Sequence, residues 1–206
     1  MNLRIFIFSE DGFTNSALAA SLSILGLDVI GENENMEVAL NLISDHCPDA
    51  VVIYLEYGRT KGIELSISIR RRFPDMGIVL VSKTEDMRLI GIERKQLPIG
   101  VVMAQIAQHG DLDNLKRQVE LSLLSTHCKT QFHQNKRFTD SQIETMRLLA
   151  DGKANSEIAK VRFVSEKSVE QMLARIAQTL GISFDHKYNS RVRILNTYYD
   201  LVNGRK

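Results

Sequence analysis

The sequence predicts an α/β N-terminal domain with a flavodoxin-like fold around a five-stranded parallel sheet, followed by an all-α C-terminal domain. Three observations support this prediction. Over residues 1–124, short apolar runs alternate with amphipathic stretches, which is typical of βαβ units and of a parallel sheet covered on both faces. Residues 125–137 lose this periodicity and are mostly polar, as expected for a linker. Residues 138–206 then carry apolar residues at helical spacing.

Five apolar runs are the predicted strands. Continuous apolar runs are expected for parallel strands, because such strands are buried on both faces of the sheet. The runs lie at 3–8, 27–30, 50–55, 78–81 and 99–103, and the third, AVVIYL, is the most strand-like segment of the chain. Five strands alternating with helices in this length predict a doubly wound, flavodoxin-like domain.

The stretches between these strands predict helices. Apolar residues recur there at helical spacing, and prolines end two of the stretches. The predicted helices cover 14–25, a stretch from 36 to the break at Pro48, a stretch from 63 to Pro74, and a closing helix at 112–124.

The C-terminal domain contains a predicted helix-turn-helix. Thr139 can cap a first helix, and Gly152 lies where a C-terminal cap is expected. A short helix starts at Asn155 or Ser156, and Ser165 caps a longer helix that runs to Gly181. A last helix covers 190–202. A short helix, a brief turn and a longer capped helix form the motif that presents its second helix to the DNA major groove.

Composition excludes several classes of protein. No segment approaches about 18 uninterrupted apolar residues, so we expect no membrane span, and the apolar N-terminus resembles a first strand more than a signal peptide. The two cysteines and the linker histidines match no closed zinc site, so we expect no metal or cofactor and a cytoplasmic protein with reduced thiols. No Ser/His/Asp set or paired carboxylate site indicates an enzyme.

The near-zero net charge conceals an asymmetry between the two parts of the chain. Residues 136–206 hold 13 Lys and Arg against 8 Asp and Glu, a balance of +5. Residues 1–135 hold 13 against 17, a balance of −4. A basic C-terminal part behind an acidic N-terminal part indicates a nucleic-acid partner for the former, although a solvated helix face could produce the same difference.

The C-terminal sequence resembles the LuxR-type helix-turn-helix. The stretch LLADGKANSEIA at 148–159, the opening SEKSV at 165–169 and the closing Leu180-Gly181 all follow the family pattern. With the α/β domain before it, the whole chain resembles bacterial response regulators of the NarL/LuxR type. The resemblance implies a receiver-like domain at 1–124, a linker at 125–137 and a DNA-binding domain at 138–206. It also implies a homodimer on promoter DNA, because paired half-sites require a two-fold protein.

The resemblance places the DNA-reading residues on the helix that begins after Ser165, with cations near the preceding turn. The candidates are Lys167, Ser168, Glu170, Gln171 and Arg175, together with Lys160 and Arg162. Glu170 stands where the family usually has Lys, and Met172 where it usually has His. A glutamate can accept a hydrogen bond from cytosine N4, and a glutamine can pair with adenine. Alternatively, Glu170 forms an ion pair with Lys167 or Arg175.

The receiver-like domain departs from the residues that its family uses for phosphorylation. The acidic pair after the first strand falls on Ser9 and Glu10, and the phospho-accepting aspartate falls on Tyr54. The hydroxyl position is retained as Ser82, whereas the conserved lysine of the family falls on Ala104. Mg²⁺ needs carboxylate ligands, and the transferring phosphoryl group needs cations. We therefore expect no aspartyl phosphorylation.

Two features of this domain have alternative interpretations. Either the Tyr54 ring fills the vacated acidic pocket as a structural plug, or its hydroxyl contacts a ligand at the carboxyl ends of the strands. The stripe formed by Leu112, Leu115, Val119 and Leu123 either packs against a second copy of the chain or faces the sheet. On the last helix, apolar residues offer a second contact between copies, namely Val192, Leu195, Tyr198, Tyr199 and Val202.

The sequence thus predicts a sequence-specific DNA-binding transcription regulator that acts as a homodimer without aspartyl phosphorylation. Two alternatives remain at this point. One is a regulator that senses a small ligand in the vacated receiver pocket. The other is a protein-interaction adaptor that no longer binds DNA.

Overall fold

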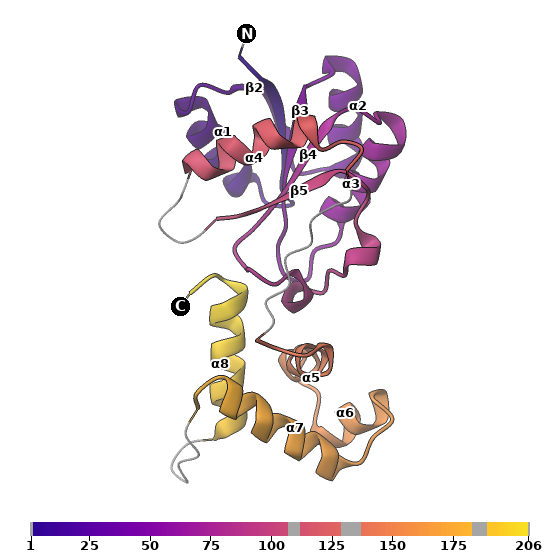
Figure 1. The fold of residues 1–206 in the computed structure, drawn as a ribbon, viewed down its shortest axis with the longest axis vertical. Helices are drawn as coiled ribbons and strands as arrows, with labels where there is room; N and C mark the ends of the chain where they lie inside the picture. The colour runs from indigo at the N-terminus through magenta and orange to yellow at the C-terminus, as the bar shows by residue number, and fades with distance from the viewer. Residues whose placement is uncertain (1, 107–111, 129–136, 183–188, 206) are drawn as a thin grey trace. The chain divides into compact units, whose positions relative to one another are not determined.

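The computed structural model describes residues 2–106, 112–128, 137–182 and 189–205. The chain divides into two compact units (Figure 1). The first unit comprises Met1–Lys83 and Ile92–His133, and the second comprises Thr84–Gly91 and Gln134–Lys206. The segment Thr84–Gly91 lies within the range predicted for the receiver-like domain, 1–124, but belongs to the second unit.

The first unit is built on a five-stranded parallel sheet with strand order β2-β1-β3-β4-β5. This confirms the predicted doubly wound, flavodoxin-like fold. The strands are β1 (Arg4–Phe8), β2 (Asp28–Asn33), β3 (Ala50–Tyr54), β4 (Gly77–Ser82) and β5 (Val101–Gln105). The helices are α1 (Gly12–Ile24), α2 (Met36–His46), α3 (Lys61–Arg72) and α4 (Leu112–Leu124).

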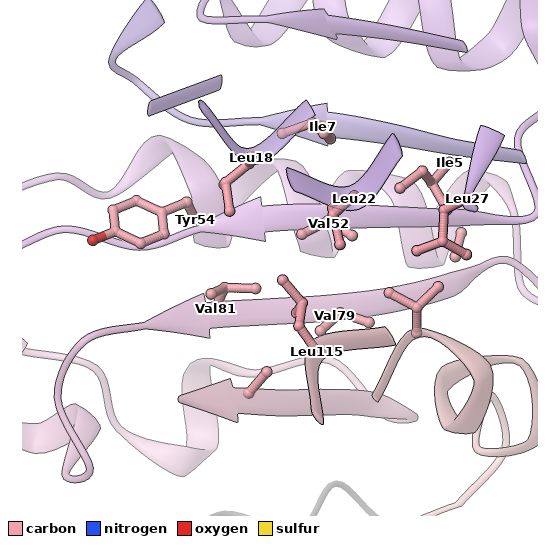
Figure 2. Packing of buried hydrophobic residues seen from close by; sticks show 13 residues of the cluster. Ile5, Ile7, Leu18, Leu22, Leu27, Val52, Tyr54, Val79, Val81 and Leu115 are labelled. Carbon is pink, nitrogen blue, oxygen red and sulfur yellow. The ribbon is translucent and has the colours of Figure 1, made fainter. Parts of the chain in front are cut away.

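Alternate strand residues point to opposite faces of the sheet, and each face has its own helical cover. On one face, Leu18 and Leu22 of α1 and Leu115 of α4 pack against Val52 and Val79 in a single buried cluster (Figure 2). On the other face lie α2 and α3, which contact each other. Between β4 and β5 the structure has two short 3-10 helices, η1 (Met87–Ile90) and η2 (Arg94–Gln96), instead of a long α-helix.

The apolar stripe of α4 faces the sheet of its own chain. Leu115 and Val119 are buried in the cluster of Figure 2, and Leu123 packs against it. The side chain of Leu112 lies outside the described residues. The interpretation that this stripe packs against a second copy of the chain is therefore wrong for Leu115 and Val119, because these two side chains are buried within their own unit.

The second unit contains α5 (Asp140–Ala150), α6 (Asn155–Val161), α7 (Glu166–Thr179) and α8 (Ser190–Val202), together with η1. The predicted caps are present: Thr139 caps α5 and Ser165 caps α7. Gly152 and Gly181 follow α5 and α7 with positive φ angles of 80° and 72°, a conformation that favours glycine.

The core of the second unit joins all four α-helices. Each helix contributes residues that are at most 7% exposed: Ile143, Met146, Leu149, Ile158, Val169, Ile176, Ile194, Tyr198 and Val202. Two residues of the predicted contact surface on α8, Tyr198 and Val202, thus belong to this core. Val192 and Tyr199 remain exposed on α8, at 49% and 41%.

Candidate nucleic-acid interface and strand-end site

Helix α7 has one buried and one exposed face. Ser165 starts the helix, because its Oγ accepts a hydrogen bond from the Ser168 backbone N–H at 3.2 Å. Val169, Ile176 and Ala177 are buried against the rest of the unit. Five of the predicted DNA-reading residues lie on the opposite face and are all exposed: Lys167, Ser168, Glu170, Gln171 and Arg175. The helical period brings these five together on one side of the helix.

The two cations predicted near the turn have different surroundings. Lys160 is exposed on α6. The side chain of Arg162 is only 11% exposed, and its Nε lies 3.2 Å from Glu144 Oε2. Its Nη1 donates to Thr145 Oγ1 at 2.6 Å. Arg162 therefore joins the end of α6 to α5 and does not belong to the exposed face of α7.

Glu170 is available to a partner. Among the residues that the structure describes, none of the ion pairs involves it. The exposed face of α7 thus carries the carboxylate of Glu170 together with Lys167 and Gln171. The alternative that Glu170 is occupied by Lys167 or Arg175 has no support in this arrangement.

Two features of the helix-turn-helix were missed from the sequence. Arg191 at the start of α8 donates from Nη1 to Asn155 Oδ1 at 2.8 Å and also to the Lys153 carbonyl. Phe163, in the turn between α6 and α7, has a φ of 54° and is 95% exposed. Of these two features, only the exposure of Phe163 could have been predicted from the sequence, because Phe163 is an apolar residue in a turn too short to place it in the core.

The strand-end site lies at the carboxyl ends of β1, β3 and β4. These strands are neighbours in the sheet, so Ser9, Tyr54 and Ser82 come to the same edge. All three are buried. Figure 2 shows the Tyr54 ring at the end of the buried cluster, with its hydroxyl pointing away from the labelled residues. Burial raises the pKa of Tyr54 to about 12, and the charges of Glu56 and Asp11 act in the same direction.

Ala104 belongs to the same apolar surroundings. It is buried on β5 within the cluster that contains Tyr54 and Val81. A small apolar side chain thus lies at the position that the sequence resemblance predicts for a lysine. The positions predicted for the nucleophile and the cation of phosphoryl transfer therefore hold an aromatic ring and a methyl group.

The acidic residues beside this edge already have partners within the first unit. Asp11 Oδ2 accepts hydrogen bonds from the Thr14 backbone N–H at 2.8 Å and from Thr14 Oγ1 at 2.6 Å, which lower the pKa of Asp11. Glu10 Oε1 accepts from the Lys61 backbone N–H at 3.1 Å. Glu56 forms an ion pair with Arg59 at 3.0 Å. Within the described ranges, no three His, Cys, Asp or Glu side chains gather as a metal site.

Comparison with known proteins identifies the class of the second unit. Residues 136–186 match the family described as "Bacterial regulatory proteins, luxR family". The second unit therefore contains a LuxR-type helix-turn-helix.

No helix in the described part of the chain has the length and apolar character needed to cross a membrane.

The whole chain is similar to particular regulators. It is 27% identical over 184 residues to the uncharacterized transcriptional regulatory protein YhcZ of Bacillus subtilis, covering 79% of this chain and 85% of that protein. It is 25% identical over 194 residues to the transcriptional regulatory protein LiaR of the same organism, covering 88% and 92%. A solved structure of two RcsB dimers bound to two parallel DNAs has a TM-score of 0.54 and 20% identity, covering 98% of this chain and 100% of that one.

Proposed function

We propose that this chain is a DNA-binding transcription regulator of the response-regulator type, which reads promoter DNA with the exposed face of α7 and needs no aspartyl phosphorylation. One observation carries the proposal. Lys167, Gln171 and Arg175 lie side by side on the exposed face of a capped helix in a LuxR-type helix-turn-helix. A helix of this kind places its N-terminal residues against base edges in the major groove.

The residues of this face divide by the part of DNA that suits them. Lys167 and Arg175, with Lys160 on α6, suit phosphates or guanine, and Ser168 can donate to phosphate. Gln171 suits adenine, and Glu170 suits cytosine N4. Arg162 is instead a positioning residue, because its contacts with Glu144 and Thr145 hold α6 against α5. Because the described residues of this surface include three such cations, we expect modest non-specific affinity.

Independence from phosphorylation rests on the strand-end site. Tyr54 occupies the position of the phospho-accepting aspartate, and Ala104 that of the lysine. The neighbouring carboxylates of Glu10 and Asp11 cap α3 and α1. Moving either carboxylate to a metal ion would cost the start of a helix its cap. Tyr54 serves in this account as a structural plug.

Homodimerisation is part of the same proposal. LuxR-type regulators that bind paired half-sites need two copies, and RcsB is bound to DNA as dimers in the similar structure. On this chain, Val192 and Tyr199 of α8 are the exposed apolar residues that a second copy of the helix could cover.

Selection of genomic DNA fragments by the purified, untreated protein tests the proposal. We expect enrichment of a two-fold motif and binding of the selected duplexes that weakens steeply with salt. Lys167→Ala should lose affinity, whereas Lys61→Ala, an exposed lysine of α3 in the first unit, is the matched control. Failure to enrich any motif would overturn the proposal and favour a missing ligand or a protein partner.

A further inference from the structure

The segment Thr84–Gly91 has an unexpected place in the fold. It connects β4 to η2 in the sequence, where a doubly wound domain usually has a helix that covers its own sheet. Here the segment forms the short helix η1 and is part of the second unit, together with α5 and α8. Helix η1 contacts both of these helices.

The apolar side chains of η1 are buried. Met87 and Leu89 are 3% and 2% exposed, and Ile90 is 8% exposed. The Tyr198 hydroxyl of α8 donates to the Leu89 carbonyl at 2.6 Å, and Tyr198 itself is fully buried. A buried tyrosine hydroxyl needs such a partner, so η1 supplies a hydrogen bond that the core of the second unit uses.

A polar network fastens the same segment to the start of α5. Arg88 forms ion pairs with the buried Asp86, at 2.6 Å, and with Asp140, the first residue of α5. Arg88 Nη2 also donates to the Phe138 carbonyl at 3.1 Å. The Arg88 side chain is only 11% exposed and that of Asp86 2%, and hydrogen bonds between charged groups are stronger than neutral ones.

We infer that Thr84–Gly91 is a docking segment that completes the folded helix-turn-helix unit by packing η1 against α5 and α8. The docking segment contacts α5 and α8, while Lys167, Gln171 and Arg175 of α7 remain exposed. It therefore stabilises the unit and does not mask the face proposed to read DNA. The contribution of the docking segment to folding does not depend on DNA binding.

Hydrogen exchange of backbone amides in the full-length chain, without DNA, tests the inference. Arg88→Ala removes the polar network, and Tyr198→Phe removes only the hydroxyl that bonds Leu89. Lys95→Ala is the matched control, because Lys95 forms an exposed ion pair with Glu93 on the neighbouring η2, outside the second unit.

We expect exchange in α5 and α8 to accelerate about tenfold in both variants, because the loss of a buried hydrogen bond lowers the stability of the whole cooperative unit. Lys95→Ala should leave these helices unchanged. Acceleration confined to residues 84–91, with α5 and α8 as in the unsubstituted protein, would overturn the inference. If Arg88→Ala fails to fold, Tyr198→Phe still tests the inference. This substitution removes only the hydroxyl that bonds the Leu89 carbonyl, so we expect the variant to fold.

Discussion

Arg162 donates from Nη1 to Thr145 Oγ1 at 2.6 Å. A cation that the sequence placed among the DNA contacts thus holds the first helix of the helix-turn-helix to α5. We expect this contact to help position α7, since α6 and α7 pack together. Residues proposed to read DNA and residues proposed to orient α7 can therefore be separated by experiment.

Arg162→Ala should lower the free energy of unfolding of the second unit by roughly 1–3 kcal/mol, the range for a hydrogen bond to a charged, mostly buried group. Lys167→Ala should leave stability nearly unchanged but reduce the dependence of log affinity on log salt by about 1. Thermal unfolding and anisotropy titrations at several salt concentrations measure the two effects. A reduced salt dependence in Arg162→Ala at unchanged stability would contradict this division of roles.

Glu170→Lys replaces the exposed carboxylate of α7 with the cation usual in the LuxR family. We expect tighter binding to unrelated duplexes and a salt dependence steeper by about 0.9, the effect of one additional phosphate contact. Glu170→Gln, which removes the charge without adding a cation, is the control. Unchanged binding to unrelated DNA would show that this position lies away from the phosphates.

Tyr54 should make stability sensitive to alkali. Its folded pKa of about 12 exceeds the unfolded value of 10.0, so the folded state retains the proton more strongly. This contribution to stability is fully present below pH 10 and is lost as the pH rises towards 12. The ultraviolet difference titration between the unsubstituted protein and Tyr54→Phe should show one ionisation near pH 12. A midpoint near 10 would mean that the ring is not buried in solution.

Tyr54→Asp should not restore phosphorylation. The new carboxylate would lie in an apolar cluster with Val81 and Ala104, and we expect the protein to lose about 3 kcal/mol of stability or more. Incubation with acetyl phosphate followed by intact mass measurement should show no added phosphoryl group. Tyr54→Phe controls for loss of the hydroxyl alone. A phosphorylated Tyr54→Asp protein would show that the carboxylates of Glu10 and Asp11 can give up their hydrogen bonds to the starts of α3 and α1 and bind Mg²⁺ instead.

The sequence predicted what depends on local pattern. The strands follow from continuous apolar runs, and α7 follows from the Ser165 cap together with the periodic burial of Val169 and Ile176. Gly152 and Gly181 were predicted as helix ends because few other residues adopt positive φ without strain. All of these signals lie within a few residues of the structure that they specify.

What depends on distant partners was not predictable. Arg162 carries the same charge whether it faces DNA or Glu144, and only the packing of α6 on α5 decides between them. The stripe of α4 is apolar whether it faces the sheet or a second copy of the chain. Met87–Ile90 is too short for a periodic pattern, so its place beside Tyr198 could not be foreseen.

The most direct test of the central claim compares DNA affinity with and without a phosphodonor. Anisotropy titration of a selected duplex should give the same dissociation constant for the untreated protein and for protein incubated with acetyl phosphate and Mg²⁺. Equal affinities would mean that α7 reads DNA without a phosphate switch. Binding that appears or tightens by tenfold or more only after phosphodonor treatment, together with a protein-bound phosphoryl group, would contradict the account.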